Sequence, residues 1–223
     1  MGTSSTMSEA SVNEAALWEG QVEVEDATFF AILEETVTVL GGSGLPHLFM
    51  GGLASAALGR PRWTHDIDVF VRPKDARPAL EALAAAGFRT QETNPEWLFK
   101  ALKDRVLVDV IFVSSGGVLL DQEMADRAQH AEVEGCRVRV IPAEDLVVIK
   151  ALVHKEHSPR HWFDALALLR RDDLDWAYLV RRARQHGPLR VLSLLYYARS
   201  NDQVVPDHAM ADVLEAARQE VAA

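Results

Sequence analysis

The chain has 223 residues, of which 48% are hydrophobic and 25% charged, so it can bury the core of one domain or of a closely packed pair. This composition excludes a short peptide module and a disordered scaffold. No run approaches the roughly eighteen apolar residues of a membrane span, and the N-terminus lacks the pattern of a secretory signal. We therefore expect a cytoplasmic protein with no membrane partner. A single cysteine excludes an internal disulfide and a cysteine metal cluster.

The net charge of −10 is unevenly distributed along the chain. Residues 1–25 hold five Glu and no Lys or Arg, and residues 200–223 hold one basic and five acidic side chains. Residues 150–199, by contrast, hold ten basic and five acidic side chains, a balance of +5. The total charge disfavours a nucleic-acid partner, but this basic segment leaves local binding of a polyanion open. A solvated helical face is the alternative interpretation.

The predicted elements begin after a tail. Residues 1–22 are small, polar or acidic without a sustained hydrophobic period, so we expect them to form a flexible tail. From Asp26, the expected N-cap, apolar residues recur at helical spacing as far as Leu40, and the glycine-rich run 41–44 is expected to end this helix. The next predicted elements are a buried strand over 47–50, a glycine turn that opens a small helix over 51–59, a strand over 66–71 and a helix over 73–86.

The pattern changes from strands to helices at Ile141. Before it, strands are predicted near 88–91, 98–102 and 106–113, and a hairpin over 132–141. After it, helical patterns separated by Gly and Pro cover 143–156, 159–171, 174–187, 188–200 and 206–220. The sequence thus predicts an α+β fold, with a mixed-sheet α/β domain over 23–141 and an all-helical C-terminal domain over 142–223.

Three aspartates interrupt apolar strand patterns. Asp66 and Asp68 are two apart on one strand, so both carboxylates point to the same face and repel each other. A hard divalent cation commonly stabilises such a pair, and capping of a turn or strand end is the alternative role. Asp109 interrupts the most strand-like run of the chain. Three acids on two adjacent strands would hold two Mg²⁺ ions, with Mn²⁺ as the alternative, and Asp109 could also act as a general base.

Gly51 and Gly52 lie where a predicted strand gives way to a helix, and thirteen residues separate them from Asp66. Glycine lets the backbone approach a ligand closely, and the free N–H groups of a helix start favour phosphate oxygens. Ser55 is a candidate to add a hydroxyl to the same oxygens, with packing as a small residue as the alternative. Arg62 and Thr64, in the loop before the acidic strand, are further candidate phosphate ligands.

The glycine pair, this spacing, the Asp66–Asp68 pair and Asp109 together resemble the nucleotidyltransferases of the DNA polymerase beta superfamily. The stretch 57–71 is especially similar to the branch that includes AbiEii-type and MenT-type toxin nucleotidyltransferases and several small-molecule transferases. The resemblance covers about residues 45–170. It implies a nucleotidyltransferase domain with metal-dependent chemistry and does not specify the acceptor.

The resemblance continues into the helical half. Lys150 matches the lysine with which family members contact the nucleoside triphosphate, and Asp164 matches the acid of the following helix. Asp164 is expected to contact the base or ribose, with an ion pair to Arg160 as the alternative. Two positions depart from the family pattern: His65 stands where members often have Lys, and His161 where they often have a second acid.

The resemblance implies transfer of a nucleoside monophosphate from a nucleoside triphosphate to a hydroxyl acceptor, with release of pyrophosphate. As in toxin-type members, the acceptor would be RNA or tRNA, and an antitoxin protein would be a further partner. A small hydroxylated molecule such as an antibiotic is the alternative acceptor, and a non-catalytic nucleotide-binding or protein-interaction module is the alternative role. The expected metal ligands and catalytic residues are Asp66, Asp68 and Asp109, and the expected nucleotide-binding residues are Gly51, Gly52, Ser55, Arg62, Thr64, Lys150 and Asp164.

Overall fold

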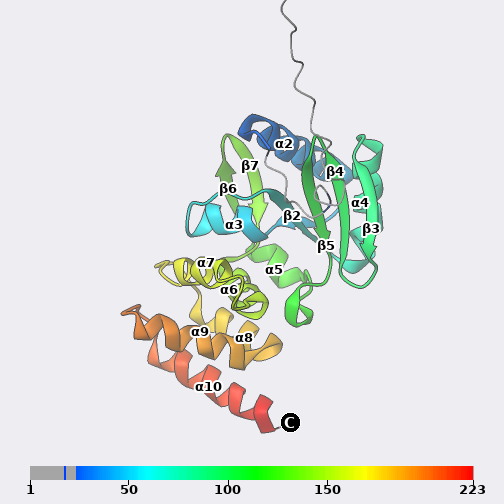
Figure 1. Cartoon of the computed structure of the whole chain (residues 1–223). Coiled ribbons are helices and arrows are strands. Elements are labelled where there is room, and N and C mark those ends of the chain that lie inside the picture. The colour runs from blue at the N-terminus through cyan, green and yellow to red at the C-terminus, as the bar shows by residue number, and fades with distance from the viewer. Residues whose placement is uncertain (1–17, 19–23, 223) are drawn as a thin grey trace, which may run out of the picture.

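The computed structural model of the chain describes Trp18 and residues 24–222. Apart from Trp18, the tail predicted over 1–22 lies outside the described residues. The described part contains a seven-stranded mixed sheet, followed in the chain by five helices (Figure 1). The prediction of an α+β fold with a helical C-terminal part is therefore confirmed.

The centre of the sheet is formed by strands that the sequence marks as apolar runs. The sheet order is β3-β4-β5-β2-β1-β7-β6. Strands β2 and β5 pair in parallel, whereas β1 pairs antiparallel to β2 and β4 antiparallel to β5. The strands are β1 His47–Phe49, β2 Asp66–Val71, β3 Arg89–Asn94, β4 Leu98–Lys103, β5 Val106–Ile111, β6 Gln129–Val133 and β7 Cys136–Val140.

Side chains alternate between the two faces of the central strands. In β2, Ile67 and Val69 are fully buried, whereas Asp66 and Asp68 are only partly buried. Because successive strand residues point to opposite faces, the two aspartates share one face and the two apolar residues the other. Helices α2 (Asp26–Ser43) and α4 (Ala76–Ala85) pack against each other, and both contact β5. Helix α3 (Gly51–Leu58) packs against β2.

Three details of the helices differ from the sequence prediction. Helix α2 does not break at Gly41: it continues through Gly42 and ends at Gly44, which adopts φ 70° as the C-cap. A helical glycine costs only about 1 kcal/mol relative to alanine, which packing can outweigh, so only the left-handed residue ends the helix. Glu25 holds the N-cap position that was predicted for Asp26. A short helix missed by the sequence analysis, α5 (Gln122–Arg127), is capped by the Asp121 carboxylate, which accepts from Met124 N at 2.8 Å.

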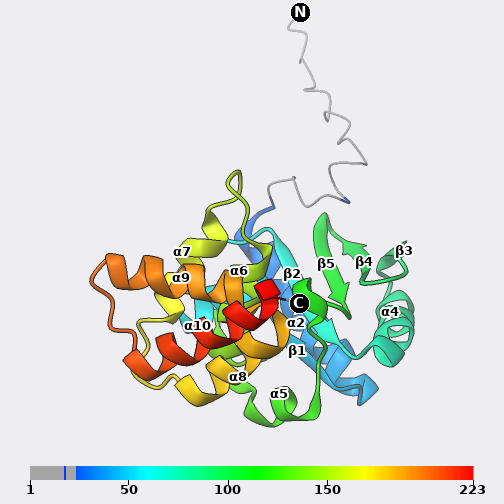
Figure 2. The same cartoon turned by 90° about the horizontal axis from the view of Figure 1, so that it is seen from below.

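The helical part is organised around α6, which is buried on nearly every side. Helices α7, α8 and α9 pack on it, and it also contacts α3 and the short turn Ser115–Gly117 (η2) after β5 (Figure 2). These helices are α6 Ala143–Val153, α7 Arg160–Leu168, α8 Trp176–His186, α9 Pro188–Ser200 and α10 Asp207–Ala222. Through α6 the helices form one wall of a cleft whose other wall is the sheet. No helix among the described residues is long and apolar enough to cross a bilayer.

Candidate active site

The three strand aspartates converge on one face of the sheet. The parallel register of β2 and β5 places Asp68 directly opposite Asp109, with Asp66 two residues away on the same strand face. One carboxylate oxygen from each residue lies within 4.8 Å of the other two. Thr64 donates to Asp66 Oδ1 at 2.8 Å and fixes that carboxylate. The structure thus brings together the three residues that the sequence marked as metal ligands.

The charges of this cluster are incompletely balanced. Burial raises the pKa of Asp68 to about 8, and repulsion by Asp66 and Asp109 adds to this rise. Burial also raises the pKa of Asp109 to about 6, although Lys100 opposes the rise. Lys100 Nζ lies 3.6 Å from Asp109 Oδ1, and this oxygen is buried without a hydrogen bond. Ionisation of all three carboxylates is therefore unfavourable without additional positive charge.

This donor set fits a divalent cation. Carboxylate oxygens are the ligands that Mg²⁺ and Mn²⁺ prefer, and three of them converge here at a spacing that one or two ions can bridge. The unbonded Oδ1 of Asp109 and the raised pKa of Asp68 show that positive charge would stabilise the ionised carboxylates. Asp66, Asp68 and Asp109 could therefore hold a metal.

The glycine turn at the start of α3, Gly51 and Gly52, closes against the same cluster. Gly51 has φ 59°, and a Cβ atom at this position would lie 1.7 Å from Asp68 Oδ2. A Cβ on Gly52 would lie 2.3 Å from Thr64 Oγ1, and the Gly52 N–H donates to Asp68 Oδ2 at 3.4 Å. The glycines are thus required for the close approach of β2 to the start of α3, beside the acids. Ser55 is fully buried, and its hydroxyl donates to Gly51 O at 2.7 Å.

A buried ion cluster joins the loop before β2 to the helical part. Asp164 on α7 is fully buried and accepts from Arg60 and, through both of its oxygens, from Arg62. Lys150 Nζ on α6 lies 3.2 Å from Asp164 Oδ2. Burial lowers the pKa of Lys150, and the charges of Asp164 and Asp68 oppose this shift. Asp164 is therefore paired with these three cations, and the alternative partner predicted for it, Arg160, is not among them.

A cavity of about 850 Å³ lies between the sheet and α6 and contains the acid cluster. Eight of the ten predicted site residues line it, including the glycine pair, the three aspartates and Lys150. The other two, Ser55 and Asp164, lie behind its wall. Asp164 instead orients Arg62 and Lys150, which do line the cavity.

The structure adds residues to the site that the sequence analysis missed. Trp97 lines the cavity, and Lys100 pairs with Asp109. Both depend on the register of β4 against β5, and no local sequence pattern gave that register. Arg160 and His161, at the start of α7, also line the cavity. Burial and the charge of Lys150 lower the pKa of His161 to about 4, so its imidazole is neutral at pH 7.

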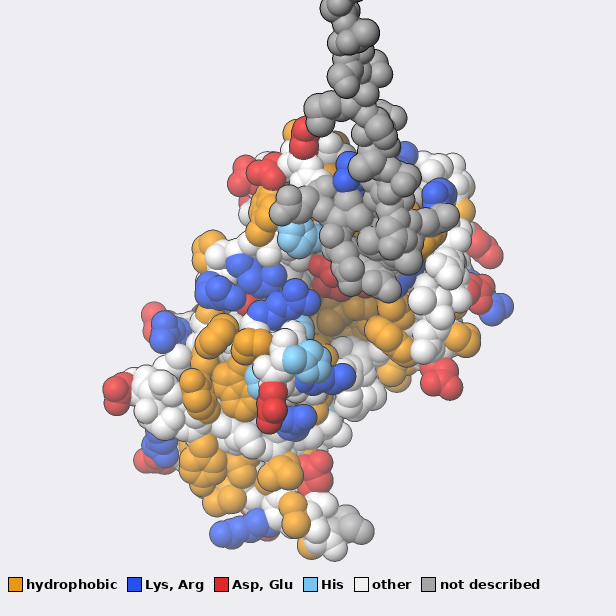
Figure 3. Space-filling model, viewed as in Figure 1, with side chains coloured by type: hydrophobic (Ala, Val, Ile, Leu, Met, Phe, Trp, Pro, Cys, Tyr) orange, Lys and Arg blue, Asp and Glu red, His pale blue; other side chains and the backbone are white. Residues whose placement is uncertain are grey.

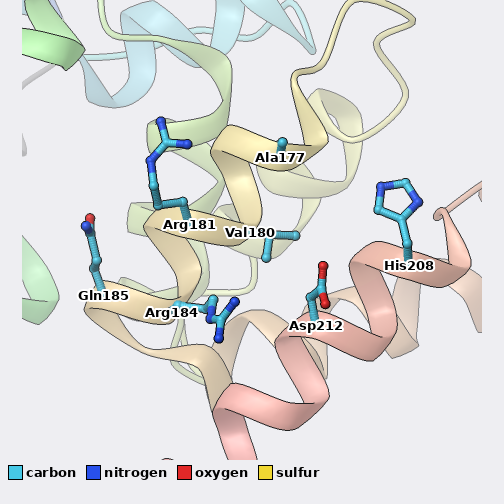
Figure 4. A pocket seen from close by; sticks show the side chains of 7 residues that line it. All are labelled: Ala177, Val180, Arg181, Arg184, Gln185, His208 and Asp212. Carbon is cyan, nitrogen blue, oxygen red and sulfur yellow. The ribbon is translucent and has the colours of Figure 1, made fainter.

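A second hollow, of about 440 Å³, lies between α8 and α10 (Figure 4). Arg181 and Arg184 of α8 line it together with His208 and Asp212 of α10; Arg184 lies toward Asp212, whereas Arg181 points away from α10. It contains neither a glycine turn nor a group of converging carboxylates. The cavity with the acid cluster is therefore the candidate active site.

A comparison with known protein families matches most of the chain. A family described as an uncharacterised nucleotidyltransferase matches residues 4–201 of the chain. No curated protein sequence matches this chain.

Several solved structures are similar to this chain. The solution structure of the antibiotic-resistance factor ANT(2'')-Ia aligns with a TM-score of 0.51 at 17% identity, over 80% of this chain and 95% of that chain. The lincosamide antibiotic adenylyltransferase LnuA aligns with a TM-score of 0.46 at 14% identity, over 66% of this chain and 98% of that one. JHP933 from Helicobacter pylori aligns with a TM-score of 0.46 at 14% identity, over 87% of this chain and 90% of its own.

Proposed function

Because this chain belongs to the family of uncharacterised nucleotidyltransferases, we propose that it transfers a nucleoside monophosphate from a nucleoside triphosphate to the hydroxyl group of an acceptor. The observation that carries the proposal is the convergence of Asp66, Asp68 and Asp109 beside the glycine turn. A group of three partly buried acids beside the start of a helix is suited to a polyphosphate that arrives with its metal ions.

Asp66, Asp68 and Asp109 would hold the metal, which we propose to be a pair of Mg²⁺ ions, with Mn²⁺ as a substitute. When bound, such ions neutralise the charge that develops on the transferred and leaving phosphates. The chain itself fixes the ligands: Thr64 orients Asp66, and the Gly52 N–H orients Asp68. Preorganised ligands of this kind do not have to reorganise during the reaction.

The triphosphate would lie on the side of the cavity formed by the glycine turn. There, Gly51 and Gly52 line the cavity at the start of α3, and Arg62 and Lys150 supply positive charge. Asp164 holds both cations in place through its ion pairs. Ser55 would support the turn through its bond to Gly51 O, so its role is to shape the backbone that meets the phosphates.

In the transfer, the acceptor oxygen forms a bond to the α-phosphorus while the bond between the α-phosphorus and the bridging oxygen breaks. Pyrophosphate leaves with that electron pair. Asp109, which lines the cavity, would take the proton of the acceptor hydroxyl through its carboxylate. Because little covalent chemistry falls to the protein, the rate should depend on positioning and on charge neutralisation.

We propose RNA, such as the end of a tRNA, as the acceptor, in which case an antitoxin protein would be a natural partner. Arg160 lines the cavity, and Arg60, which pairs with Asp164, has a side chain that is 44% exposed; both would meet phosphates of a strand. A small hydroxylated molecule is the second candidate. The net charge of −10 favours it, because a strongly acidic protein repels a nucleic acid at long range.

The test is a transfer assay with each α-labelled nucleoside triphosphate, Mg²⁺, and either total RNA or a mixture of small metabolites. We expect label in one acceptor fraction and release of pyrophosphate. The rate of transfer should be at least about 100-fold lower in Asp68→Asn than in the wild type. If Asp68→Asn transfers label at the wild-type rate, the assignment of the acid cluster is wrong. Binding of no triphosphate in the presence of Mg²⁺ would instead favour a module without catalytic activity.

A further inference from the structure

The cavity is chemically asymmetric along the sheet. One group of its cations lies beside the start of α3: Arg62 comes from the loop before β2, and Asp164 joins it to Lys150 on α6. On the face shown in Figure 3, Lys and Arg side chains gather on one side of the hollow between the sheet and the helices, and hydrophobic side chains on the other. The acid cluster therefore separates two compartments of different chemistry.

The second compartment lies on the side of β5 and β4. The end of β5 contributes Ile111 and Val113, and α6 contributes Ile149 and Val153 from the opposite wall. Asp109 is the member of the acid cluster that β5 carries, so this compartment lies next to the proposed proton acceptor. A group bound here would present its hydroxyl to Asp109.

Trp97 forms an exposed aromatic surface in this compartment. It is 43% exposed, and its backbone is fixed because Phe112 N donates to Trp97 O at 3.0 Å. The cavity contains a second exposed tryptophan, Trp63, but that ring packs on Phe29 and Phe30 at centroid distances of 6.1 and 5.8 Å. Among the described residues, no aromatic ring contacts Trp97. The side chain of Trp97 lines the cavity and is partly exposed.

We propose that Trp97 is the platform for the acceptor, and that the acceptor is a hydroxyl-bearing group with an uncharged planar ring, such as a nucleoside. This inference rests on the proposed function and narrows its substrate class. Stacking on tryptophan depends little on which planar ring is bound. The aliphatic side chains of β5 and α6 would enclose the edges of that ring. A free nucleoside and the terminal nucleoside of an RNA strand share this chemistry.

The same compartment is unsuited to a polycationic acceptor. Of the described residues that line the cavity, the only acids are the three clustered aspartates. Lys100 already pairs with Asp109, and Arg62, Lys150 and Arg160 add further positive charge to the wall. A ligand with several ammonium groups would find no free carboxylate once the cluster binds metal.

The test uses the full chain with its nucleotide site filled by Mg²⁺ and a non-hydrolysable analogue of the triphosphate that the transfer assay selects. Adenosine, a tRNA transcript and tobramycin are titrated as probes by calorimetry. The variants are Trp97→Ala, Trp97→Phe, which keeps a ring, and Tyr196→Ala, which removes an exposed aromatic residue of α9 that does not line the cavity. Triphosphate binding is measured for each variant as well.

We expect adenosine or the tRNA transcript to bind and tobramycin not to. Trp97→Ala should weaken that binding about tenfold or more, Trp97→Phe should restore most of it, and Tyr196→Ala should change it less than about twofold. Whichever of adenosine and the tRNA transcript binds more tightly shows whether the planar ring belongs to a free nucleoside or to an RNA strand. Triphosphate binding should not change in any variant.

Preferential binding of tobramycin, binding of neither adenosine nor the transcript, or equal probe binding by Trp97→Ala would each overturn the proposal. A loss of triphosphate binding in Trp97→Ala would also overturn it, because the ring would then hold the nucleotide. If the wild type binds no triphosphate, the proposed function fails, and the same titrations without nucleotide still decide the role of Trp97.

Discussion

Gly51 shows how a single residue determines the geometry of the site. Its φ is positive, and a Cβ at this position would lie only 1.7 Å from Asp68 Oδ2, so there is no room for a side chain. Gly42 is the opposite case, because it lies inside α2 and a Cβ there would contact nothing within 4 Å. The sequence showed both as turn-type glycines, and only the fold distinguishes them.

Gly51→Ala should therefore displace Asp68 and destabilise the protein by about 2 kcal/mol or more, through backbone strain and overpacking. Gly42→Ala should stabilise it by about 0.5–1 kcal/mol, because alanine is the better helix residue. Urea denaturation of both variants measures these changes. Equal effects of the two substitutions would contradict the role assigned to the turn.

Asp68 lies next to two other acids, so its negative charge would help to bind metal but would destabilise the fold. Without metal, Asp68→Asn should raise the melting temperature by a few degrees, because it removes repulsion from Asp66 and Asp109 in a buried site. In the presence of Mg²⁺ this advantage should shrink, because the wild type then gains the binding free energy of the ion. A calorimetric scan with EDTA and one with Mg²⁺ compare the two; a lower melting temperature of the variant in EDTA would contradict this interpretation.

At the scale of the elements, the Asp164 cluster connects the loop before β2 with α6 and α7. Asp164→Asn would leave the buried Lys150 ammonium without its partner, at a cost of about 3–5 kcal/mol. Asp173→Asn is the matched control: Asp173 pairs with Arg171 but is 61% exposed, so its loss should change stability by less than about 0.5 kcal/mol. Equal losses in the two variants would show that the cluster does not hold the elements together.

The same cluster predicts a pH dependence. Burial alone would raise the pKa of Asp164, but hydrogen bonds from Arg62 and the charge of Lys150 outweigh it and hold the pKa below its usual value. Its contribution to stability is therefore complete above the unfolded pKa of about 3.9 and is lost as the pH falls through the folded value. Between pH 5 and pH 2, the free energy of unfolding should fall more steeply for the wild type than for Asp164→Asn. Parallel curves would contradict the assignment.

Most helices and strands could be predicted from the sequence, because hydrophobic period, proline and glycine are local signals. The contacts between these elements could not be predicted in this way. Asp164 meets Arg62 across 102 positions of the chain, and Lys100 meets Asp109 only because β4 and β5 pair in one register. The acid cluster was predictable because one strand carries two of its members and a family motif placed the third. Trp97 carried no motif, so only the structure could assign it to the cavity.

At the scale of the whole molecule, the site exists because the sheet and the helical part close on each other. The sheet supplies the acids, α3 the glycine turn, and α6 and α7 the cations and the opposite wall. The distribution of charge agrees with this division, since the basic segment 150–199 contributes to the cleft while both ends of the chain are acidic. Activity should therefore depend on both parts together.

The most direct test of this account is a titration of the wild type and Asp68→Asn with Mn²⁺, followed by electron paramagnetic resonance, with and without the selected triphosphate. We predict that the wild type binds Mn²⁺, that the triphosphate tightens this binding, and that Asp68→Asn loses at least about tenfold in affinity. Equal Mn²⁺ binding by the two proteins, or none by the wild type with triphosphate present, would contradict the claim that these aspartates form a metal site.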